Sequence, residues 1–243
     1  MAGNDRSFVG DAGTAVAACC TDVAGTPAQP RECPPILHLD ETCIVVDKPA
    51  GCPSVPGRGA LADGSVAQQV QAVFPEALVV HRLDMATSGV LLFARGAHWQ
   101  RHYSIEFAQR RIAKQYAALV EGRLGNAVGD FGVIDLPLSA DWPNRPRQRI
   151  DQAAGKPSLT HWRSVAFDAA GLSTRLALTP VTGRSHQLRV HLLAIGHPII
   201  GDALYGSGDS GPPQRRLMLH ACSLAWWHPL RGCDIGVESP VPF

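Results

Sequence analysis

The sequence predicts an α+β domain with a central mixed, mainly antiparallel sheet and a few flanking helices. Three observations support this class. Short segments that are apolar throughout, or apolar at every second residue, are separated by turns that contain Gly, Pro or Asp. In a few segments the apolar residues have the spacing of a helix. Strands and helices do not alternate regularly, and the sequence has no internal repeat. At 243 residues, the chain is long enough to bury one full core, so one domain accounts for it.

The first predicted elements follow an extension. Residues 1–33 are rich in Ala, Gly, Thr and Pro without apolar periodicity, which predicts a disordered extension, so the folded domain is expected to span residues 34–243. Two apolar runs within residues 36–49 flank a polar turn and predict a hairpin. Residues 52–59 contain two prolines and two glycines and predict a loop.

Two segments place large apolar residues four apart, which predicts helices. They are residues 65–75, with Val66, Val70 and Phe74, and residues 96–110, with Trp99, Tyr103 and Phe107. Ser65 is a typical cap for the first helix, and Pro75 ends it. We interpret the aromatic stripe of the second helix as core packing.

The other strands are predicted from the alternation of residues between two faces and from short apolar runs. A strand is expected on each side of the 81–89 turn, then at 111–122, 217–227 and 233–243, the last an edge strand limited by its prolines. Residues 174–202 predict a strand, a Gly-containing turn, a helix and a loop. The Pro- and Arg-rich segment 135–162 crosses to the next strands.

Composition excludes several classes of protein. The chain is 45% hydrophobic and 18% charged, with no apolar run long enough to cross a bilayer and no N-terminal secretory pattern. Seven cysteines form no CxxC pair, which argues against a disulfide framework or a thiolate zinc site and favours the cytoplasm. The net charge is only +1, yet the basic residues cluster at 110–114 and 145–156, as a solvated face or as a surface for phosphate.

The stretch "HRLD" at residues 81–84 is the leading candidate for chemistry. His81, Arg82 and Asp84 follow an apolar run, where a carboxylate is costly unless it is paired. Asp84 is either a turn residue that accepts backbone hydrogen bonds or a catalytic acid. Arg184, just before the helix in 174–202, is either a surface cation or the counter-charge that keeps Asp84 ionised and oriented.

Other site types are weighed against these residues. Tyr116 lies in a predicted strand as a core aromatic or as a flat face for a stacked base. Ser185 and His186 suggest a hydrolase triad with Asp84, but the chain has no G-x-S-x-G elbow, and adjacent side chains point apart. The histidines at 186, 191 and 197 lack metal-binding spacing, so no metal is expected.

Four segments together resemble the successive motifs of the RluA-type pseudouridine synthases. They are "HRLDMATSGVLLFAR", "KQYAALVEG", "GRSHQLRVHLLAIGHPIIGD" and "LMLHA", and the resemblance covers about residues 35–243. It implies the pseudouridine synthase fold and the isomerisation of uridine to pseudouridine in RNA. It also implies that the reaction uses no cofactor and no metal.

The resemblance assigns roles to five residues. Asp84 matches the catalytic aspartate, and Tyr116 matches a catalytic tyrosine that stacks on the target base and is also a candidate for proton removal. Arg184 matches the arginine paired with that aspartate, and Arg82 the arginine near the flipped nucleotide. Leu219 matches an apolar contact to the uracil.

Two segments, "DMATSG" and residues 135–160, are similar to the dual-specificity branch of the family, and no S4-type RNA-binding module precedes the domain. The expected partners are a tRNA anticodon stem–loop, modified at uridine 32, and a 23S rRNA hairpin, modified at uridine 746. Arg58, Arg145 and Arg147 are assigned to RNA recognition or, alternatively, to a solvated loop. We expect a cytoplasmic monomer without membrane contact. A single RNA substrate and a non-catalytic RNA-binding module stay open as alternatives.

Overall fold

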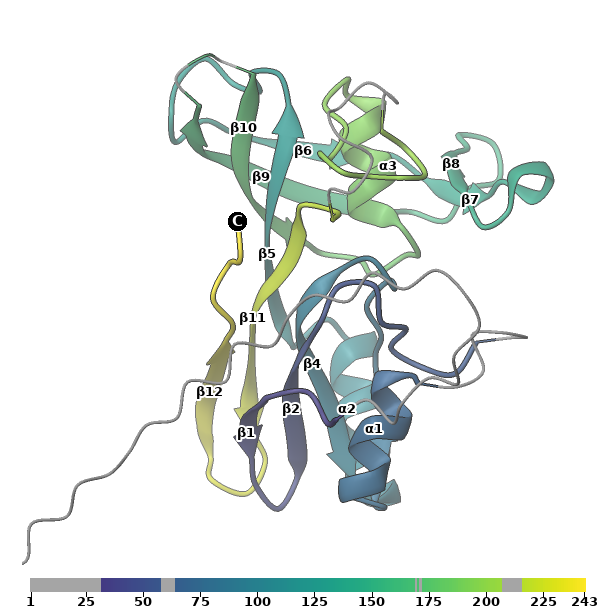
Figure 1. The fold of residues 1–243 in the computed structure, drawn as a ribbon, viewed down its shortest axis with the longest axis vertical. Helices are drawn as coiled ribbons and strands as arrows, with labels where there is room; N and C mark the ends of the chain where they lie inside the picture. Colours follow the sequence, from purple (N-terminus) through teal and green to yellow (C-terminus); the bar gives the residue numbers. More distant parts are fainter. Residues whose placement is uncertain (1–31, 58–63, 169, 171, 207–215) are drawn as a thin grey trace, which may run out of the picture.

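Ten strands form one continuous sheet along the molecule in the computed structural model, and three helices pack against it (Figure 1). The structure describes residues 32–57, 64–168, 170, 172–206 and 216–243. The strands of the main sheet are β1 (Ile36–Leu39), β2 (Cys43–Lys48), β3 (Ala77–Val79), β4 (Ser88–Arg95), β5 (Ala113–Glu121), β6 (Phe131–Asp135), β9 (Leu159–Phe167), β10 (Ser173–Pro180), β11 (Leu219–His228) and β12 (Cys233–Glu238). The helices are α1 (Val66–Val73), α2 (Ala97–Ala108) and α3 (Gln187–Ala194).

The strand order is β1-β2-β4-β11-β5-β10-β9-β6, with β3 paired to β4 and β12 paired to β11. Every pair is antiparallel except β4 and β11, which run parallel over two residue pairs. The predicted α+β class with a mixed, mainly antiparallel sheet is therefore confirmed. The first part of β5 pairs with β11 and its second part with β10, so β5 links the two halves of the sheet.

The half of the sheet around β2 and β4 is buried on both faces. Leu91 and Phe93 of β4 pack in one cluster with Val66 and Val70 of α1, whereas Leu92 packs in another with Tyr103 of α2. Because both faces of β4 are buried, the sequence of this strand is a nearly continuous apolar run. The aromatic stripe of α2 is core packing, as predicted, because Tyr103 is fully buried.

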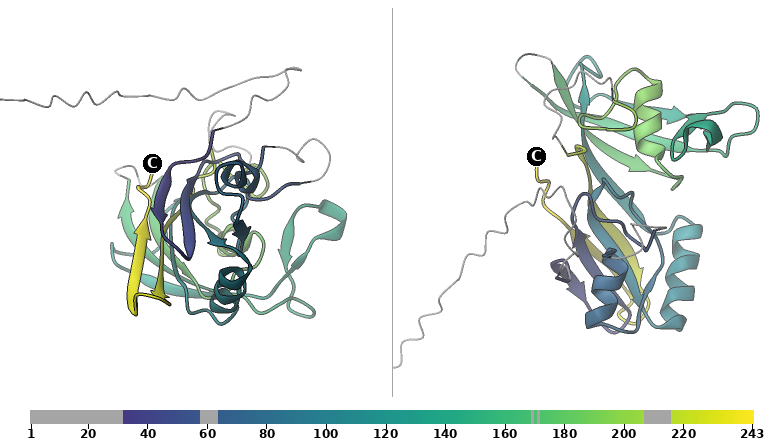
Figure 2. Two further views of the ribbon diagram at one scale, coloured as in Figure 1. Left: turned by 90° about the horizontal axis from the view of Figure 1, so that it is seen from below. Right: turned by 45° about the vertical axis from the view of Figure 1, so that its right-hand side comes forward.

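In the other half, α3 packs on β5 and β10 through a third apolar cluster that contains Leu176, Leu178, Leu188 and Leu192. A short hairpin of β7 (Leu138–Ala140) and β8 (Gln148–Ile150), joined through a 3₁₀ turn at Trp142–Asn144, projects from this half. Figure 2 shows this hairpin, which we call the arm, standing away from the sheet on the side of α3.

Local chemistry explains where α1 begins. Ser65 accepts a hydrogen bond from the backbone of Gln68, and the Gln68 side chain accepts one from the Ser65 backbone, which is a complete capping box. The predicted helix is thus confirmed, and it ends just before Pro75.

Gly89 is needed where β4 meets β11. Its φ is +111°, and a Cβ atom at this position would lie 2.1 Å from the carbonyl oxygen of Ala221. Only a residue without a side chain permits this close parallel contact, which comes five residues after Asp84.

The predicted hairpin at 36–49, the helix at 96–110 and the strands around the 81–89 turn are confirmed as β1–β2, α2 and β3–β4. Strand β6 and the arm were not predicted. The predicted extension lies outside the described residues up to residue 31, and Cys33, which was assigned to it, packs against the core cluster under α1. Within the described residues, no helix has the length and apolar character needed to span a membrane.

Candidate active site

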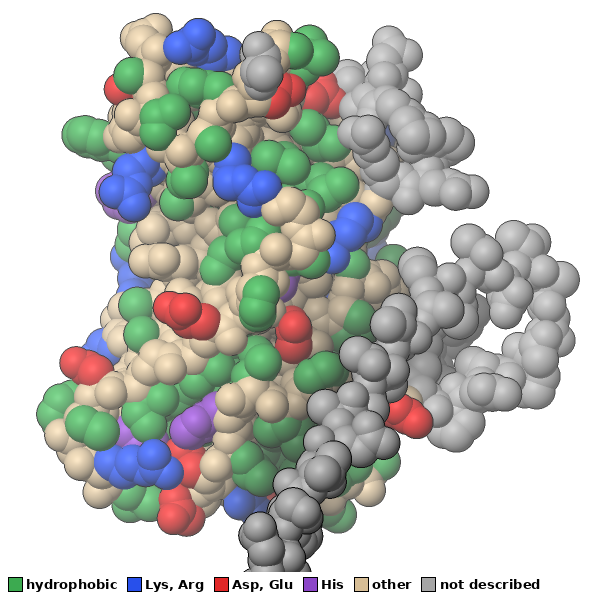
Figure 3. Space-filling model, turned by 60° about the vertical axis from the view of Figure 1, so that its left-hand side comes forward, with side chains coloured by type: hydrophobic (Ala, Val, Ile, Leu, Met, Phe, Trp, Pro, Cys, Tyr) green, Lys and Arg blue, Asp and Glu red, His purple; other side chains and the backbone are tan. Residues whose placement is uncertain are grey.

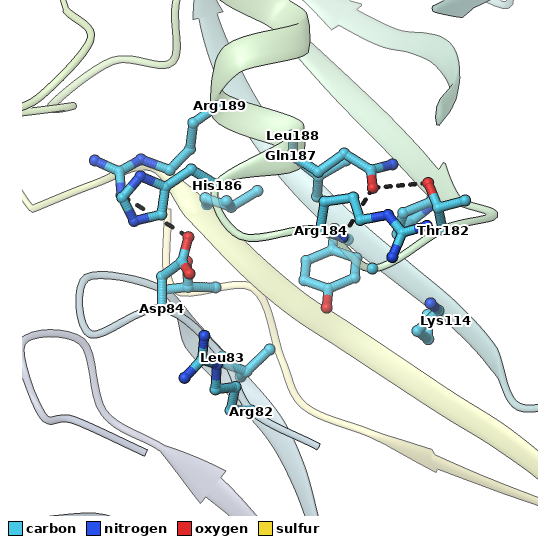
Figure 4. Close-up of a pocket in the computed structure, with 15 residues that line it drawn as sticks. Arg82, Leu83, Asp84, Lys114, Thr182, Arg184, His186, Gln187, Leu188 and Arg189 are labelled. Atoms are coloured by element: carbon cyan, nitrogen blue, oxygen red, sulfur yellow. Dashed lines mark hydrogen bonds and ion pairs between the residues drawn. The ribbon is translucent and has the colours of Figure 1, made fainter. Parts of the chain in front are cut away.

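Asp84 lies in the turn between β3 and β4, at a cleft between the two halves of the sheet. The cleft encloses about 500 Å³, its open mouth included, and Arg82, Asp84, Tyr116, Arg189 and Leu219 are among its lining residues. Figure 4 shows Asp84 facing the residues of the α3 N-terminus across this cleft.

A neighbouring loop, residues 48–54, holds the Asp84 turn through the backbone. The Ser54 hydroxyl accepts a hydrogen bond from the Leu83 N–H at 3.0 Å and donates one to the Leu83 carbonyl at 2.7 Å. The Gly51 N–H donates to the Met85 carbonyl at 2.8 Å. The main chain on both sides of Asp84 is therefore fixed, which preorganises the carboxylate.

Lys48 completes this support from beneath the turn. Its ammonium is fully buried and donates to the carbonyls of Pro49, Met85 and Thr87 at 2.9, 3.0 and 2.6 Å. Burial lowers the pKa of Lys48 to about 8, although the negative charge of Asp84 acts in the opposite direction. The buried cation thus supports the turn and also places positive charge behind the carboxylate.

Arg189 is the cation beside Asp84. Its Nη1 lies 3.8 Å from Asp84 Oδ2, and its Nε and Nη2 donate to the two oxygens of Asp202 at 2.7 and 2.6 Å. Arg189 is only 4% exposed, and burial alone would lower its pKa, but the bond to Asp202 and the charges of both carboxylates raise it. Asp202 thus fixes a permanently charged guanidinium against the Asp84 carboxylate.

The predicted pairing of Arg184 with Asp84 is wrong. Arg184 is exposed on the turn before α3, and its Nε donates to the carbonyl of Pro157 at 3.5 Å. Figure 4 shows it on the Thr182 and Lys114 side of the cleft, away from Asp84. The physical reason is that Arg184 precedes the helix, whereas Arg189 lies within the first turns of α3 and faces inward.

Tyr116 and Leu219 line the same cleft from β5 and β11, as predicted. Burial, and then the nearby charge of Asp84, raise the pKa of the Tyr116 phenol above its usual value. The ring is therefore a neutral face at physiological pH. Leu219 is 3% exposed and offers an apolar wall.

The predicted RNA-binding arginines follow a longer groove. Arg82 lines the central cleft and the cavities on both sides of it, and its Nη2 donates to Ser185 Oγ at 3.4 Å. Arg145 and Arg147 of the arm line the cavity that also contains Asp84. The guanidinium of Arg145 lies 3.4 Å from the ring centre of Trp142. Arg58 lies outside the described residues.

His81, the first residue of the polar cluster, has a structural role. Its Nε2 accepts the Leu92 N–H at 2.9 Å, and its ring stacks on Phe107 with centroids 4.3 Å apart. Burial, with the charge of Lys114, lowers the pKa of His81 to about 3. The polar cluster therefore contains a neutral histidine, His81, that supports strand β4, and a carboxylate, Asp84, that faces the cleft.

The alternative hydrolase triad is not formed. Ser185 Oγ accepts from Arg82, whereas His186 Nδ1 bonds to the hydroxyl of Tyr205, so the serine and histidine do not contact each other through a hydrogen bond. His191 and His197 bond elsewhere, His191 to Thr160 and Leu136 and His197 to Glu121. The three histidines thus do not converge on one point.

One group among the described residues has metal-ligand types close together: His38, Asp40 and Cys43. The two oxygens of Asp40 already accept hydrogen bonds from Thr42, Cys43, His38 and His228. Burial also raises the pKa of the Cys43 thiol to about 12, so it stays protonated. These residues do not fit a metal, and we interpret them as a buried polar network.

Sequence reasoning missed two cations of the site, Lys48 and Arg189, and placed a third, Lys114, only in the basic cluster at 110–114. Lys114 lines the cleft from β5, and burial, with the charge of Arg110, lowers its pKa. The motif that carries Arg184 also contains Arg189, so the signal was present. Which of the two turns inward is decided by Asp202, thirteen residues further along the chain than Arg189.

Comparison with known proteins identifies the family of the chain. Residues 42–194 match the family model described as RNA pseudouridylate synthase. The chain is 45% identical over 208 residues to the dual-specificity RNA pseudouridine synthase RluA of Escherichia coli (strain K12), covering 86% of this chain and 93% of that protein. The corresponding Yersinia pestis protein is 47% identical over 208 residues, covering 86% of this chain and 99% of that protein.

A solved structure gives the same result at the level of the fold. The human RNA pseudouridylate synthase domain containing 1 superposes with a TM-score of 0.72 at 29% identity. The match covers 90% of this chain and 87% of the human chain.

Proposed function

The chain belongs to the RNA pseudouridylate synthase family, and on this premise we propose that it modifies two RNAs, a tRNA anticodon stem–loop and a hairpin of 23S rRNA. The enzyme is an isomerase that converts uridine to pseudouridine in RNA. The support for two substrates is the similarity to dual-specificity relatives over 86% of the chain. Uridine 32 of the tRNA and uridine 746 of the rRNA are the proposed targets, and the cytoplasm the proposed location.

The reaction is an internal rearrangement. The bond between N1 of the base and C1′ of the ribose breaks, the uracil turns, C5 bonds to C1′, and the proton on C5 leaves while N1 gains one. No atom is gained or lost overall, so the site must supply an aimed carboxylate, a surface for the base and a route for protons.

Asp84 is the proposed catalytic carboxylate, either by attack at C1′ or by assistance to cleavage of the glycosidic bond. The observation that carries this assignment is the pair of Asp84 and Arg189, 3.8 Å apart in the cleft, with Arg189 fixed by Asp202. Arg189 takes the counter-charge role that the sequence assigned to Arg184. A second cation, Lys48, supports the same turn.

The target base has to leave its stack to reach Asp84, at a cost of a few kcal/mol. Tyr116 is proposed to stack on the extruded base, Leu219 to contact its edge, and Arg82 to bind the adjacent backbone. Stacking on an aromatic ring contributes about 1–3 kcal/mol per base, which offsets the cost of extrusion. Arg145 and Arg147 are proposed to hold the flanking RNA, and the enzyme to act as a monomer.

Asp84→Asn tests the chemistry. The variant keeps the size and shape of the side chain, but it replaces one carboxylate oxygen by an NH2 donor and loses the charge and the nucleophilicity. We expect RNA affinity within about threefold of wild type, since Arg82, Arg145 and Arg147 and the stacking surface of Tyr116 are unchanged, and no detectable pseudouridine. A gel-shift titration and mass-spectrometric mapping of the product measure the two quantities. Retained turnover would remove Asp84 from the catalytic role.

The dual specificity is tested with separate substrates. Purified protein is incubated with each of the two stem–loop RNAs alone, and we expect pseudouridine at one uridine in each. A matched RNA with cytidine at the target position is the control for site selection. If pseudouridine forms in only one of the two RNAs, the proposal of dual specificity fails, and the protein is a single-substrate synthase with the same mechanism.

A further inference from the structure

His186 stands where the catalytic cleft opens into the groove lined by the arm. It lines both cavities together with Asp84 and Arg189. Figure 4 shows its ring above the Asp84 carboxylate, on the same side of the cleft as Arg189. Its position alone makes it accessible to a nucleotide that reaches Asp84.

The backbone of His186 is held in an uncommon conformation. It is the residue before the first turn of α3, with φ 54° and ψ 17°, the left-handed region that most side chains avoid. A residue there usually caps the helix through its side chain, yet the His186 side chain makes no such bond. Helix capping therefore does not explain the presence of this ring, and strained residues of this kind gather at functional sites.

The hydrogen-bond partners determine which ring nitrogen carries the proton. The Tyr205 hydroxyl accepts the Gln148 N–H at 2.7 Å and lies 2.8 Å from His186 Nδ1. Among the described residues, His186 Nδ1 is the one acceptor within reach of the hydroxyl proton, so Tyr205 donates to Nδ1. The neutral ring then has its own proton on Nε2.

The Nε2–H is free to bind a ligand. In the described part of the chain it has no hydrogen-bond partner, although it borders a cleft. Burial lowers the pKa of His186, which keeps the ring neutral, while the charge of Asp84 partly opposes the shift. A neutral N–H donor beside a carboxylate complements oxygen atoms of a nucleotide, which the carboxylate itself would repel.

We propose that His186 donates its Nε2–H to a ribose or phosphate oxygen of the extruded nucleotide, and that Tyr205 is the positioning residue that fixes this tautomer. The inference rests on the proposed function of the Asp84 cleft. It adds a substrate-contacting residue and connects it to the arm, because Gln148, which donates to Tyr205, is the first residue of β8. RNA that binds Arg145 and Arg147 on the arm is therefore expected to affect the orientation of His186 through Tyr205.

Two variants separate contact from structure. His186→Asn tolerates the left-handed backbone, and its amide oxygen can accept from Tyr205, but it is too short to reach the Nε2 position. His186→Gln extends an amide donor to that position. Single-turnover rates are measured on whichever stem–loop the wild-type protein converts, with thermal unfolding as the control for folding.

We expect His186→Asn to lower the single-turnover rate at least about tenfold, with Tm within about 2 °C of wild type, and His186→Gln to recover much of the rate. A rate within about twofold of wild type for His186→Asn would overturn the proposal. So would an equal loss of rate in both variants, because a donor at the Nε2 position would then have no effect.

A 2′-deoxy substitution at the target nucleotide identifies the oxygen. If wild type loses rate on this RNA and His186→Asn loses no more, the partner is the ribose 2′-oxygen; additive losses indicate the phosphate. Either pattern supports the contact once His186→Asn is slower on the unmodified RNA.

The tautomer is tested without turnover. Imidazole ¹⁵N spectra of the full chain at pH 7, with His186→Asn used to assign the signal, should show a protonated Nε2 that shifts when a stem–loop is added. Tyr205→Phe should convert this signal to a mixture of tautomers. A protonated Nδ1 in the wild-type protein would overturn the proposal. If wild type converts neither stem–loop while the Nε2–H is present, the substrate assignment fails and the tautomer assignment stands.

Discussion

His81 and Asp84 are three residues apart in one turn, and the structure gives them opposite electrostatic conditions. His81 is neutral, because its Nε2 accepts a backbone N–H and its ring stacks on Phe107. Asp84 keeps about a quarter of its side chain exposed and faces Arg189. Within "HRLD", one side chain therefore supports strand β4, and another faces the cleft as the proposed catalytic carboxylate.

The neutral His81 makes stability depend on pH. Its pKa is about 3 in the folded protein and about 6.5 in the unfolded chain. Between these values the unfolded chain binds a proton that the folded protein rejects, so stability falls as the pH drops below about 6.5. We expect His81 to account for a loss of about 2 kcal/mol between pH 7 and pH 5.

Urea unfolding of wild type and His81→Gln at both pH values measures this loss. Glutamine can accept the Leu92 N–H but does not titrate in this range, so the variant should lose about 2 kcal/mol less than wild type over the same interval. Equal losses in the two proteins would show that His81 is protonated at its ordinary pKa.

The two arginines of the "GRSHQLR" motif show what sequence reasoning can and cannot reach at this scale. Asp84, Tyr116 and Leu219 could be assigned to one site from the sequence because each lies within a motif that the family shares. The partner of Asp84 could not be derived from spacing, since Arg184 and Arg189 are both near the start of α3. Only the buried Asp202, which binds Arg189 through both oxygens, decides between them.

At the scale of elements, the parallel contact between β4 and β11 begins directly after the turn that contains Asp84. Gly89 lies in this contact, where a Cβ would be 2.1 Å from the Ala221 carbonyl oxygen. We expect Gly89→Ala to lower the free energy of unfolding by about 3 kcal/mol or more, because the two strands have to separate.

Gly196→Ala is the matched control for this prediction. Gly196 follows the C-terminus of α3 and also has a positive φ, +83°, but no atom lies within 4 Å of the position of its missing Cβ. It should lose only about 1 kcal/mol, the cost of the left-handed backbone conformation. Chemical denaturation compares the two variants, and similar losses would mean that the strand contact adds nothing.

Elements with strong local signals were predicted, and those without were not. Helix α1 has both a capping box and apolar residues four apart, and β2 and β4 have uninterrupted apolar runs. The arm has neither signal. Its two strands are three residues each, and Gln148 of β8 bonds to Tyr205, which lies 57 residues further along the chain.

For the whole molecule, the net charge of +1 conceals an uneven distribution. On the face in Figure 3, Lys and Arg side chains alternate with Asp and Glu, so no large patch of one sign forms there. The groove that passes Asp84 gathers Arg82, Arg145, Arg147 and Arg189 instead. RNA affinity should therefore depend on salt although the protein is nearly neutral.

Combined removal of Arg145 and Arg147 tests this distribution. We expect the double alanine variant to bind RNA more weakly at low salt and to lower the slope of log K against log salt by about 2, one per lost phosphate contact. The control variant, Arg101→Ala with Arg231→Ala, loses the same charge from exposed positions outside the groove and should keep the slope. Equal slopes for the two double variants would remove the arm from the RNA interface.

The continuity of the sheet through β5 has a mechanical consequence. Strand β5 pairs with β11 and with β10, so a single strand joins the two sides of the cleft, with one register shift in the β11–β5 pairing between Ala221 and Ser223. A movement that closed the cleft would have to bend β5 and disturb its pairing with β11 and β10. We therefore expect the fit between enzyme and substrate to come mainly from bending and unstacking of the RNA hairpin, so that RNAs whose loops deform at low cost are preferred.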